Sequence, residues 1–278
     1  MSGAGGTTAR LAAAVSGWTG WRRAAACFGF GALAVAAQPP LHFLPVLIVS
    51  FGGLVWLLDG TATRRQAFAV GWWFGAGYFA AGLYWVSNAL LVDAARFGWM
   101  IPFAVLGLSF GLGLFIGAAT WLSRLGRPSG VFRIFALAGA WTLLEWVRGA
   151  VLTGFPWNPV GNVWVAAPPV LQAASWIGVY GLSLVTVFAA AAPALLARPG
   201  LRPGLRPRLG AASGLVVLLV LAVAGAVRLS APDPGVVPGV ALRIVQANVD
   251  QAEKWRPETR AASFALHLRL SREGGLSR

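Results

Sequence analysis

The sequence predicts an α-helical polytopic membrane bundle of about seven spans, followed by the truncated start of an α/β domain outside the membrane. Hydrophobic residues occupy 58% of the 278 positions and charged residues only 11%, and the mean hydropathy is +0.71. Soluble domains carry about 25% charged residues, so most of this chain is suited to lipid. The apolar residues gather in long runs, and the composition changes abruptly after residue 229.

Apolar runs divide the first part of the chain into a cytoplasmic N-terminal segment, residues 1–23, and a membrane domain, residues 24–229. The runs lie at about 24–38, 41–58, 67–92, 97–123, 132–152, 178–197 and 209–229. Most approach the ~20 residues that a helix needs to cross a bilayer. The first run is short and continues through Gln38-Pro39-Pro40 into the second, so these two are expected to form a tight helical hairpin.

Small residues four positions apart are expected to let neighbouring spans approach closely. Such pairs are Gly71/Gly75, Gly107/Gly111 and Gly113/Gly117.

The arginines predict the orientation of the spans. With the N-terminus inside, twelve arginines face the cytoplasm and only three, Arg96, Arg148 and Arg228, face outward before the tail. This asymmetry follows the positive-inside rule and places the segment after residue 229 outside. The cytoplasmic set is Arg10, Arg22, Arg23, Arg64, Arg65, Arg124, Arg127, Arg133, Arg198, Arg202, Arg206 and Arg208. Because these bases lie between apolar runs, the net charge of +14 does not indicate a nucleic-acid partner.

Glu145 is the one acidic residue before position 230 that lies well inside an apolar run. Arg148 follows three residues later on the same helical face, where the two charges can neutralise each other. They could line a cavity or orient a lipid head group. A structural ion pair near the outer end of the helix is an equally good interpretation.

Residues 153–177 contain four prolines, three tryptophans and no charged side chain. Prolines remove backbone donors, so this stretch cannot form a regular span. Tryptophan suits the membrane–water interface, which predicts an outer-face loop in the head-group layer. Aromatic anchoring without any further role is the alternative.

The tail, residues 230–278, holds five of the eight acidic residues. A Pro/Gly-rich linker at 230–239 precedes an expected buried strand at 240–249 and a helix from about Pro257. One strand and one helix cannot bury a core of their own. The remainder of this outer domain is therefore expected beyond Arg278 or from a partner chain.

Four stretches of the chain resemble a known family. They are Gly82-Leu83-Tyr84-Trp85-Val86, the two segments Glu145–Arg148 and Leu152–Trp157, Gly178–Ser183, and Val245-Gln246-Ala247-Asn248-Val249 with Lys254-Trp255. In this order and at this separation they resemble the bacterial apolipoprotein N-acyltransferases. That family joins a multi-span membrane unit to a periplasmic nitrilase-like domain, in the bacterial inner membrane.

The resemblance implies acyl transfer from a phospholipid donor to the N-terminal amine of a diacylglyceryl-cysteine lipoprotein, through a Cys thioester and without cofactor or metal. The family's Glu base, oxyanion-stabilising Lys and Cys nucleophile are all expected beyond Arg278. By motif, Trp255 matches a tryptophan at the active-site entrance, with Gln246 and Asn248 beside it. The membrane-cavity candidates are Glu145, Arg148, Phe155, Pro156 and Trp157.

A non-catalytic membrane scaffold is the alternative function. Membrane units that resemble this one serve polyprenyl-phosphate glycosyltransferases in some actinobacteria, which implies a partner of that kind. Transport is a weaker interpretation, because apart from Glu145 and Arg148 the spans offer few polar groups for a substrate path.

Overall fold

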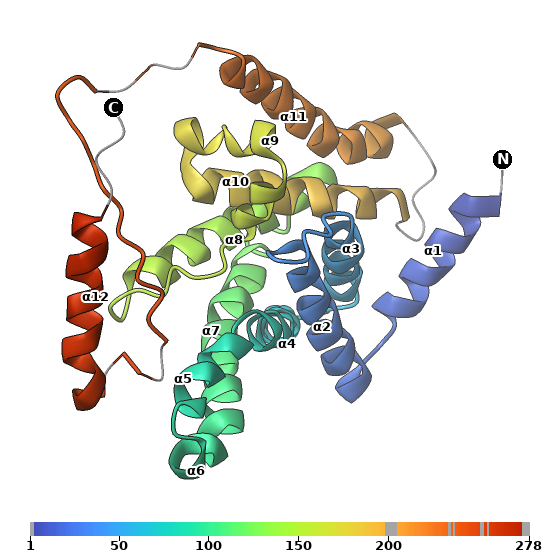
Figure 1. The fold of residues 1–278 in the computed structure, drawn as a ribbon. Helices are drawn as coiled ribbons and strands as arrows, with labels where there is room; N and C mark the ends of the chain where they lie inside the picture. Colours follow the sequence, from blue (N-terminus) through green and yellow to red (C-terminus); the bar gives the residue numbers. More distant parts are fainter. Residues whose placement is uncertain are drawn as a thin grey trace. The chain divides into compact units, whose positions relative to one another are not determined.

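The computed structural model describes residues 3–197, 205–232, 235, 237–250, 253–254 and 256–273. Regular structure in these residues is helical (Figure 1). The α-helices are α1 (Gly3–Ser16), α2 (Gly20–Ala34), α3 (Val46–Asp59), α4 (Arg64–Gly82), α5 (Ser87–Leu91), α6 (Ala94–Phe97), α7 (Ile101–Leu122), α8 (Gly130–Ala150), α9 (Pro168–Leu171), α10 (Ala174–Ala191), α11 (Leu205–Leu229) and α12 (Arg260–Arg272). Short 3₁₀ turns are η1 (Val35–Ala37), η2 (Tyr84–Val86), η3 (Gly98–Met100), η4 (Val160–Ala166), η5 (Ala192–Ala197) and η6 (Pro257–Thr259).

The chain divides into two units. The bundle unit comprises Met1–Ser87 and Met100–Ser230, and the second unit comprises Asn88–Trp99 and Ala231–Arg278. Arg198, Arg202 and Trp255 lie outside the described residues.

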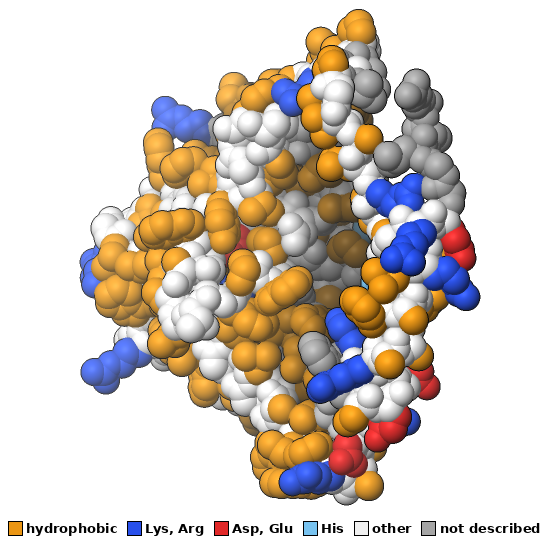
Figure 2. All heavy atoms as spheres, turned by 60° about the vertical axis from the view of Figure 1, so that its left-hand side comes forward, with side chains coloured by type: hydrophobic (Ala, Val, Ile, Leu, Met, Phe, Trp, Pro, Cys, Tyr) orange, Lys and Arg blue, Asp and Glu red, His pale blue; other side chains and the backbone are white. Residues whose placement is uncertain are grey.

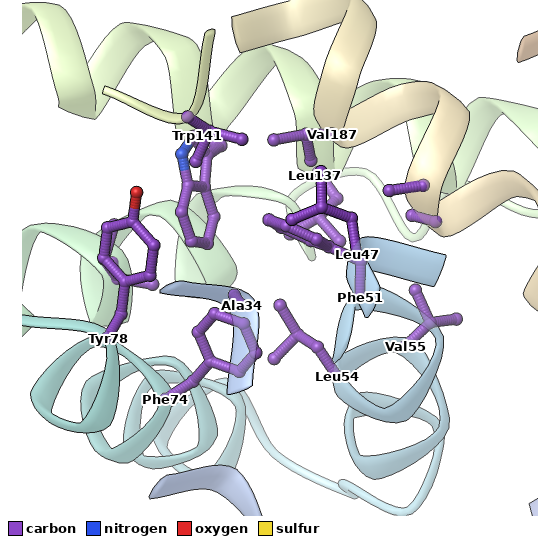
Figure 3. Packing of buried hydrophobic residues seen from close by; sticks show 14 of the residues in the cluster. Ala34, Leu47, Phe51, Leu54, Val55, Phe74, Tyr78, Leu137, Trp141 and Val187 are labelled. Atoms are coloured by element: carbon purple, nitrogen blue, oxygen red, sulfur yellow. The ribbon is translucent and has the colours of Figure 1, made fainter. Parts of the chain in front are cut away.

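Aromatic side chains fill the centre of the bundle unit, where α3, α4 and α8 meet (Figure 3). The Phe51 and Trp141 rings lie edge to face at 5.2 Å, and the Phe74 and Trp141 rings do so at 5.9 Å. All three side chains are fully buried. Aromatic pairs in this arrangement add about 0.5–1.5 kcal/mol beyond the area that they bury.

Small residues bring α4 and α7 into close contact. A Cβ atom added to Gly71 would lie 2.1 Å from Thr120 Oγ1, and one on Gly75 would lie 2.8 Å from the Gly113 Cα. The Thr120 hydroxyl donates across the same contact to the Ala67 carbonyl at 2.8 Å. Close approach at Gly71/Gly75 and at Gly113/Gly117 is confirmed, whereas added Cβ atoms at Gly107 and Gly111 would meet no described atom within 4 Å.

Four helical segments of the described chain are long and apolar enough to cross a membrane: Ala94–Leu122, Gly130–Ala150, Ala174–Ala197 and Leu205–Leu229. The expectation of about seven spans is therefore met only in part. Helices α2 and α3 contain 15 and 14 residues, because the turn at Gln38-Pro39-Pro40 separates them. Helix α4 begins with two arginines and ends at Gly82, ten residues before the expected boundary.

The outer surface of the bundle unit is largely apolar. On α7, Phe103 is 70% exposed, and on α11, Leu215 is 69% exposed. Hydrophobic side chains cover much of the face shown in Figure 2. A surface of this kind is suited to lipid, in agreement with helices that span a membrane.

In the second unit, neither the expected buried strand nor the expected α/β domain is formed by the described residues. Residues 240–249 form no strand, and Leu242 and Ile244 are 86% and 93% exposed rather than buried. A strand requires a neighbour for its backbone groups, and the described residues supply none. The helix expected from about Pro257 is confirmed as η6 and α12, but its Phe264 is 67% exposed. An α/β outer domain is thus not formed by the described residues.

Candidate functional site

The chain reverses direction sharply where α8 ends. Val151 is extended at φ −80° and ψ 154°, and Leu152, Thr153 and Gly154 follow with φ of 54°, 72° and 82°. A Cβ atom on Gly154 would lie 2.3 Å from the Gly149 carbonyl oxygen, so only glycine fits there. The turn sends the following residues, 155–160, back along the last turns of α8.

Arg148 binds this returning segment. Its Nη1 atom donates to the Phe155 and Trp157 carbonyl oxygens at 2.6 and 2.7 Å, and the Phe155 amide donates to the Arg148 carbonyl at 2.9 Å. The guanidinium carbon also lies 5.1 Å from the centre of the Phe79 ring on α4. Arg148 is only 2% exposed, so carbonyl oxygens and an aromatic face replace its water.

Glu145 lies one turn earlier on α8 and is likewise 2% exposed. Its Oε1 atom accepts from the Val160 amide at 2.9 Å, and the Trp141 and Ser183 side chains also face the carboxylate. The ion pair that was one of the two interpretations is not formed, since the described residues show no contact of Glu145 with Arg148 within 4.0 Å. Each charge instead binds the backbone of the loop, although the two still attract each other at longer range.

A second set of buried polar groups fixes the same loop from the other side. Gln38 Nε2 donates to the Tyr78 hydroxyl at 2.8 Å and to the Pro159 carbonyl at 3.1 Å. Tyr78 in turn donates to the Asn158 carbonyl at 3.0 Å, and Asn158 Nδ2 donates to the Gly82 carbonyl at 3.0 Å. The loop therefore joins α4 and the α2–α3 turn to α8 by hydrogen bonds that lie inside the protein.

The segment that follows is held against α10. The Gly161 amide donates to Ser183 Oγ at 2.9 Å, and Trp164 Nε1 donates to Thr186 Oγ1 at 2.7 Å. The absence of a regular span from residues 153–177 is confirmed up to residue 173, where only the short elements η4 and α9 occur, whereas residues 174–177 belong to α10. Helix α10 begins a few residues earlier than expected and changes direction at Gly178, where φ is 66°.

The tip of the loop remains open to its surroundings. Pro156 is exposed and Phe155 is half-buried, while Trp157 is 56% exposed. The Trp157 ring meets that of Trp85 at 5.9 Å with an interplanar angle of 70°. Of the membrane-cavity candidates, Glu145 and Arg148 thus form the buried support, and Phe155, Pro156 and Trp157 form the segment that they hold. That these residues line a cavity stays a prediction.

The site residues predicted in the tail belong to the second unit. Gln246 and Asn248 are exposed, and Asn248 has a φ of 47°. Trp255 lies outside the described residues. A role for these three residues in substrate binding also stays a prediction.

Sequence reasoning missed Gln38, Tyr78 and Asn158 as members of this site. Each is an isolated polar residue within or beside an apolar run, and such residues need a partner when they are buried. Their isolation among apolar residues could have marked these three as candidates. It could not have shown which groups they bind. As described, the site holds a loop in one position and offers neither a thiol nor a histidine among the residues named above.

Comparison with known proteins places this arrangement in a family. Residues 30–192, which include the loop and its support, match the model of the apolipoprotein N-acyltransferase N-terminal domain. The chain is 43% identical over 275 residues to an apolipoprotein N-acyltransferase of Allorhizobium ampelinum, which covers 94% of this chain and 50% of that protein. It is 43% identical over 284 residues to the Brucella suis protein of the same name, with 95% and 51% covered. A Rhodopseudomonas palustris relative is 39% identical over 272 residues, with 96% and 50% covered.

The chain therefore spans about half the length of the curated relatives that it matches. The match to the family model runs from within α2 to the end of α10 and includes the loop after α8. On this match, the chain belongs to the apolipoprotein N-acyltransferase family.

Proposed function

We propose that this chain is the membrane half of an enzyme that moves an acyl chain from a phospholipid to the N-terminal amine of a diacylglyceryl-cysteine lipoprotein. Family membership supports this activity, because the relatives carry the corresponding name. The proposed location is the bacterial inner membrane, with the N-terminus cytoplasmic and the tail outside. About seven spans are proposed, although α2, α3 and α4 are shorter or more polar than the other four.

The observation that carries the proposal is the anchored loop after α8. Glu145 and Arg148 would normally be excluded from membrane depth, and the protein uses both to hold loop backbone. The same loop presents Trp157 beside Trp85, with both rings partly exposed. Tryptophan favours the membrane–water interface, where the acyl donor and the lipid anchor of the acceptor both lie. We assign this aromatic edge to the positioning of the two lipids.

The chemical steps are assigned to the nitrilase-like domain that the family resemblance implies after residue 278. A Glu takes the proton of the Cys thiol, the thiolate attacks the phospholipid ester carbon, the ester C–O bond breaks, and the Glu returns the proton to the departing oxygen. The lipoprotein amine then attacks the thioester carbon, the C–S bond breaks, and a Glu accepts the proton that the amine loses. Gln246, Asn248 and Trp255 are proposed to border the entrance to that site.

A chimera tests the proposal. Residues 1–278 are joined to the remaining half of the Brucella suis relative and expressed in cells depleted of their own enzyme. Mass spectrometry of lipoprotein N-terminal peptides then measures acylation of the amine. We expect full acylation by the chimera and a loss of at least about tenfold when Trp85 and Trp157 are both changed to Ala, on the scale of about 1.4 kcal/mol per factor of ten.

Trp21→Ala is the matched control, since Trp21 is 76% exposed on α2 and takes no part in the loop. An inactive but correctly folded chimera would reject the enzyme proposal. If such a chimera also captured a polyprenyl-phosphate glycosyltransferase in a pull-down, the scaffold function would take its place.

A further inference from the structure

A polar cavity of about 510 Å³ lies at the end of the bundle where α3 and α7 end and α8 begins. Its polar lining consists of Ser16, Asp59, Ser123, Arg124, Arg127 and Arg133. Arg133 and Glu145 are twelve residues apart on α8, which corresponds to about 18 Å along a helix. The cavity is therefore separate from the loop site, and its volume falls in the range of small-molecule sites.

The lining carries an excess of two positive charges, from three guanidinium groups and one carboxylate. Asp59 forms an ion pair with Arg133. Arg124 donates to the Thr61 carbonyl at 3.0 Å and to the Leu58 carbonyl at 3.5 Å, near the end of α3. The Ser16 and Ser123 hydroxyls donate to carbonyls of their own helices at 3.0 and 2.8 Å. The guanidinium groups are thus the donors that remain for a ligand.

Arg133 supplies the most specific observation. Its side chain is 12% exposed, and its Nε and Nη2 atoms are buried without a hydrogen-bond partner in the part of the chain that is described. Leaving a buried donor without a partner costs about 1–3 kcal/mol. An arginine presents Nε and a terminal nitrogen as two parallel donors, a geometry that matches two oxygens of a phosphate group. Both atoms of Arg133 are closed to solvent in this structure, so its side chain must turn toward the cavity to present them to a ligand.

We propose that this cavity binds a phosphate group, with Arg133 as the buried donor and Arg124 and Arg127 adding positive charge at the rim. Helices α7 and α8 are long and apolar enough to cross a membrane, so their ends are expected at the depth of the lipid head groups. The phosphate can therefore come from a phospholipid of that leaflet or from a free phosphate in solution. The two sources share the chemistry that the arginines recognise. This site is independent of the proposed acyl transfer.

Calorimetric titration of the purified chain in uncharged detergent tests the proposal, with inorganic phosphate and short-chain phosphatidylglycerol as separate probes. Arg127→Gln is expected to weaken binding of the recognised probe about fivefold, because Arg127 is exposed and contributes charge. Asp59→Asn is expected to strengthen it about fivefold, because Arg133 loses its competing carboxylate. A purely structural role for Asp59 would not produce tighter binding.

Arg228→Gln, which removes an exposed arginine elsewhere on the bundle unit, is the control of equal charge change. The double change Asp59→Asn with Arg133→Gln removes the ion pair as a whole and is expected to abolish binding without leaving a lone buried charge. Binding of both probes identifies phosphate itself as the ligand, and binding of phosphatidylglycerol alone identifies a lipid head group. The proposal is overturned if neither probe binds at up to about 10 mM, or if the Arg127 and Asp59 variants bind like the unchanged chain.

Discussion

Arg148 is a cation that the protein removes from water and surrounds with carbonyl oxygens. Two hydrogen bonds of 2.6 and 2.7 Å, together with the Phe79 ring, take the place of its hydration. Glu145 nearby lowers the cost further through charge attraction. The compensation is incomplete, because Arg148 Nε and Glu145 Oε2 are buried without a hydrogen-bond partner among the described residues. Loss of any further partner would leave a charge uncompensated, at a cost of several kcal/mol.

We expect Arg148→Met to destabilise the bundle unit by about 3–5 kcal/mol, because it leaves Glu145 as an uncompensated buried charge and two carbonyls without donors. Thermal unfolding in detergent measures the loss, and amide hydrogen exchange at residues 155–160 should rise. Arg148→Lys should recover only part of the stability, because one ammonium does not present a planar fork. An Arg148→Met protein with unchanged unfolding temperature and exchange would contradict this account.

The sequence marks Glu145 and Arg148 as unusual, because they are charged residues inside an apolar run. It does not reveal which groups they bind. Charges three residues apart on a helix suggest an ion pair, and that reasoning uses local geometry only. Their actual partners are backbone groups of residues 155, 157 and 160. These come within reach because Leu152 and Thr153 adopt positive φ, which neither residue type favours. The path of the loop therefore could not be derived from residue types.

At the scale of the elements, the close contact between α4 and α7 depends on glycines, which have no side chain to keep the two backbones apart. Gly71 and Gly75 on α4 face α7 at distances that leave no room for a Cβ atom. In lipid, helix association gains little from the hydrophobic effect, so close van der Waals packing carries much of the stability. The Thr120 to Ala67 hydrogen bond forms because the backbones approach this closely.

Gly71→Ala should accordingly destabilise the bundle by about 1–3 kcal/mol, because its methyl group would overlap Thr120 and the Ile116 carbonyl. Gly111→Ala is the matched control on α7. An added Cβ there meets no described atom within 4 Å, so the change in the free energy of unfolding should stay within about 0.5 kcal/mol. The test is to measure the unfolding temperatures of the Gly71→Ala and Gly111→Ala variants side by side and compare each with that of the unchanged protein. Equal losses would mean that the glycine contact is not the cause.

Apolar runs predicted helix positions well and helix ends poorly. Runs at 132–152 and 209–229 correspond to α8 and α11 within a few residues. The run at 67–92 instead breaks at Gly82, whose carbonyl accepts from Asn158, a residue far away in sequence. The expected strand at 240–249 failed for a related reason, because a strand depends on a neighbour that local sequence does not specify. Contacts with residues distant in sequence therefore determine where α4 ends and whether residues 240–249 form a strand. The hydrophobic pattern of the local sequence does not contain this information.

For the whole molecule, the membrane orientation is the main open prediction. Helix α8 has 21 residues and a length of about 31 Å, enough to cross the hydrocarbon core. Leu125 and Leu152, which flank it, are 42% and 92% exposed. They should therefore lie on opposite sides of the membrane, and the arginine distribution predicts that Leu125 is inside.

Cysteine labelling in intact cells measures this orientation. In a Cys27→Ala background, Leu152→Cys should react with a membrane-impermeant maleimide. Leu125→Cys should react only after the cells are permeabilised. The background protein without any cysteine controls for unspecific labelling. The reverse pattern would invert the predicted topology, and labelling of both positions from outside would show that α8 does not span the membrane.

The hydrogen bonds between α8 and its loop also restrict how the family can vary. Glu145 and Arg148 contact residues 155, 157 and 160, so the intervening segment forms a closed ring of fixed length. Surface loops usually tolerate insertions and deletions. Here a single added or lost residue would shift at least one carbonyl or amide away from its buried charge. Natural changes in chain length, as well as engineered tags, are therefore expected at positions such as the linker predicted for residues 230–239 and not between α8 and η4.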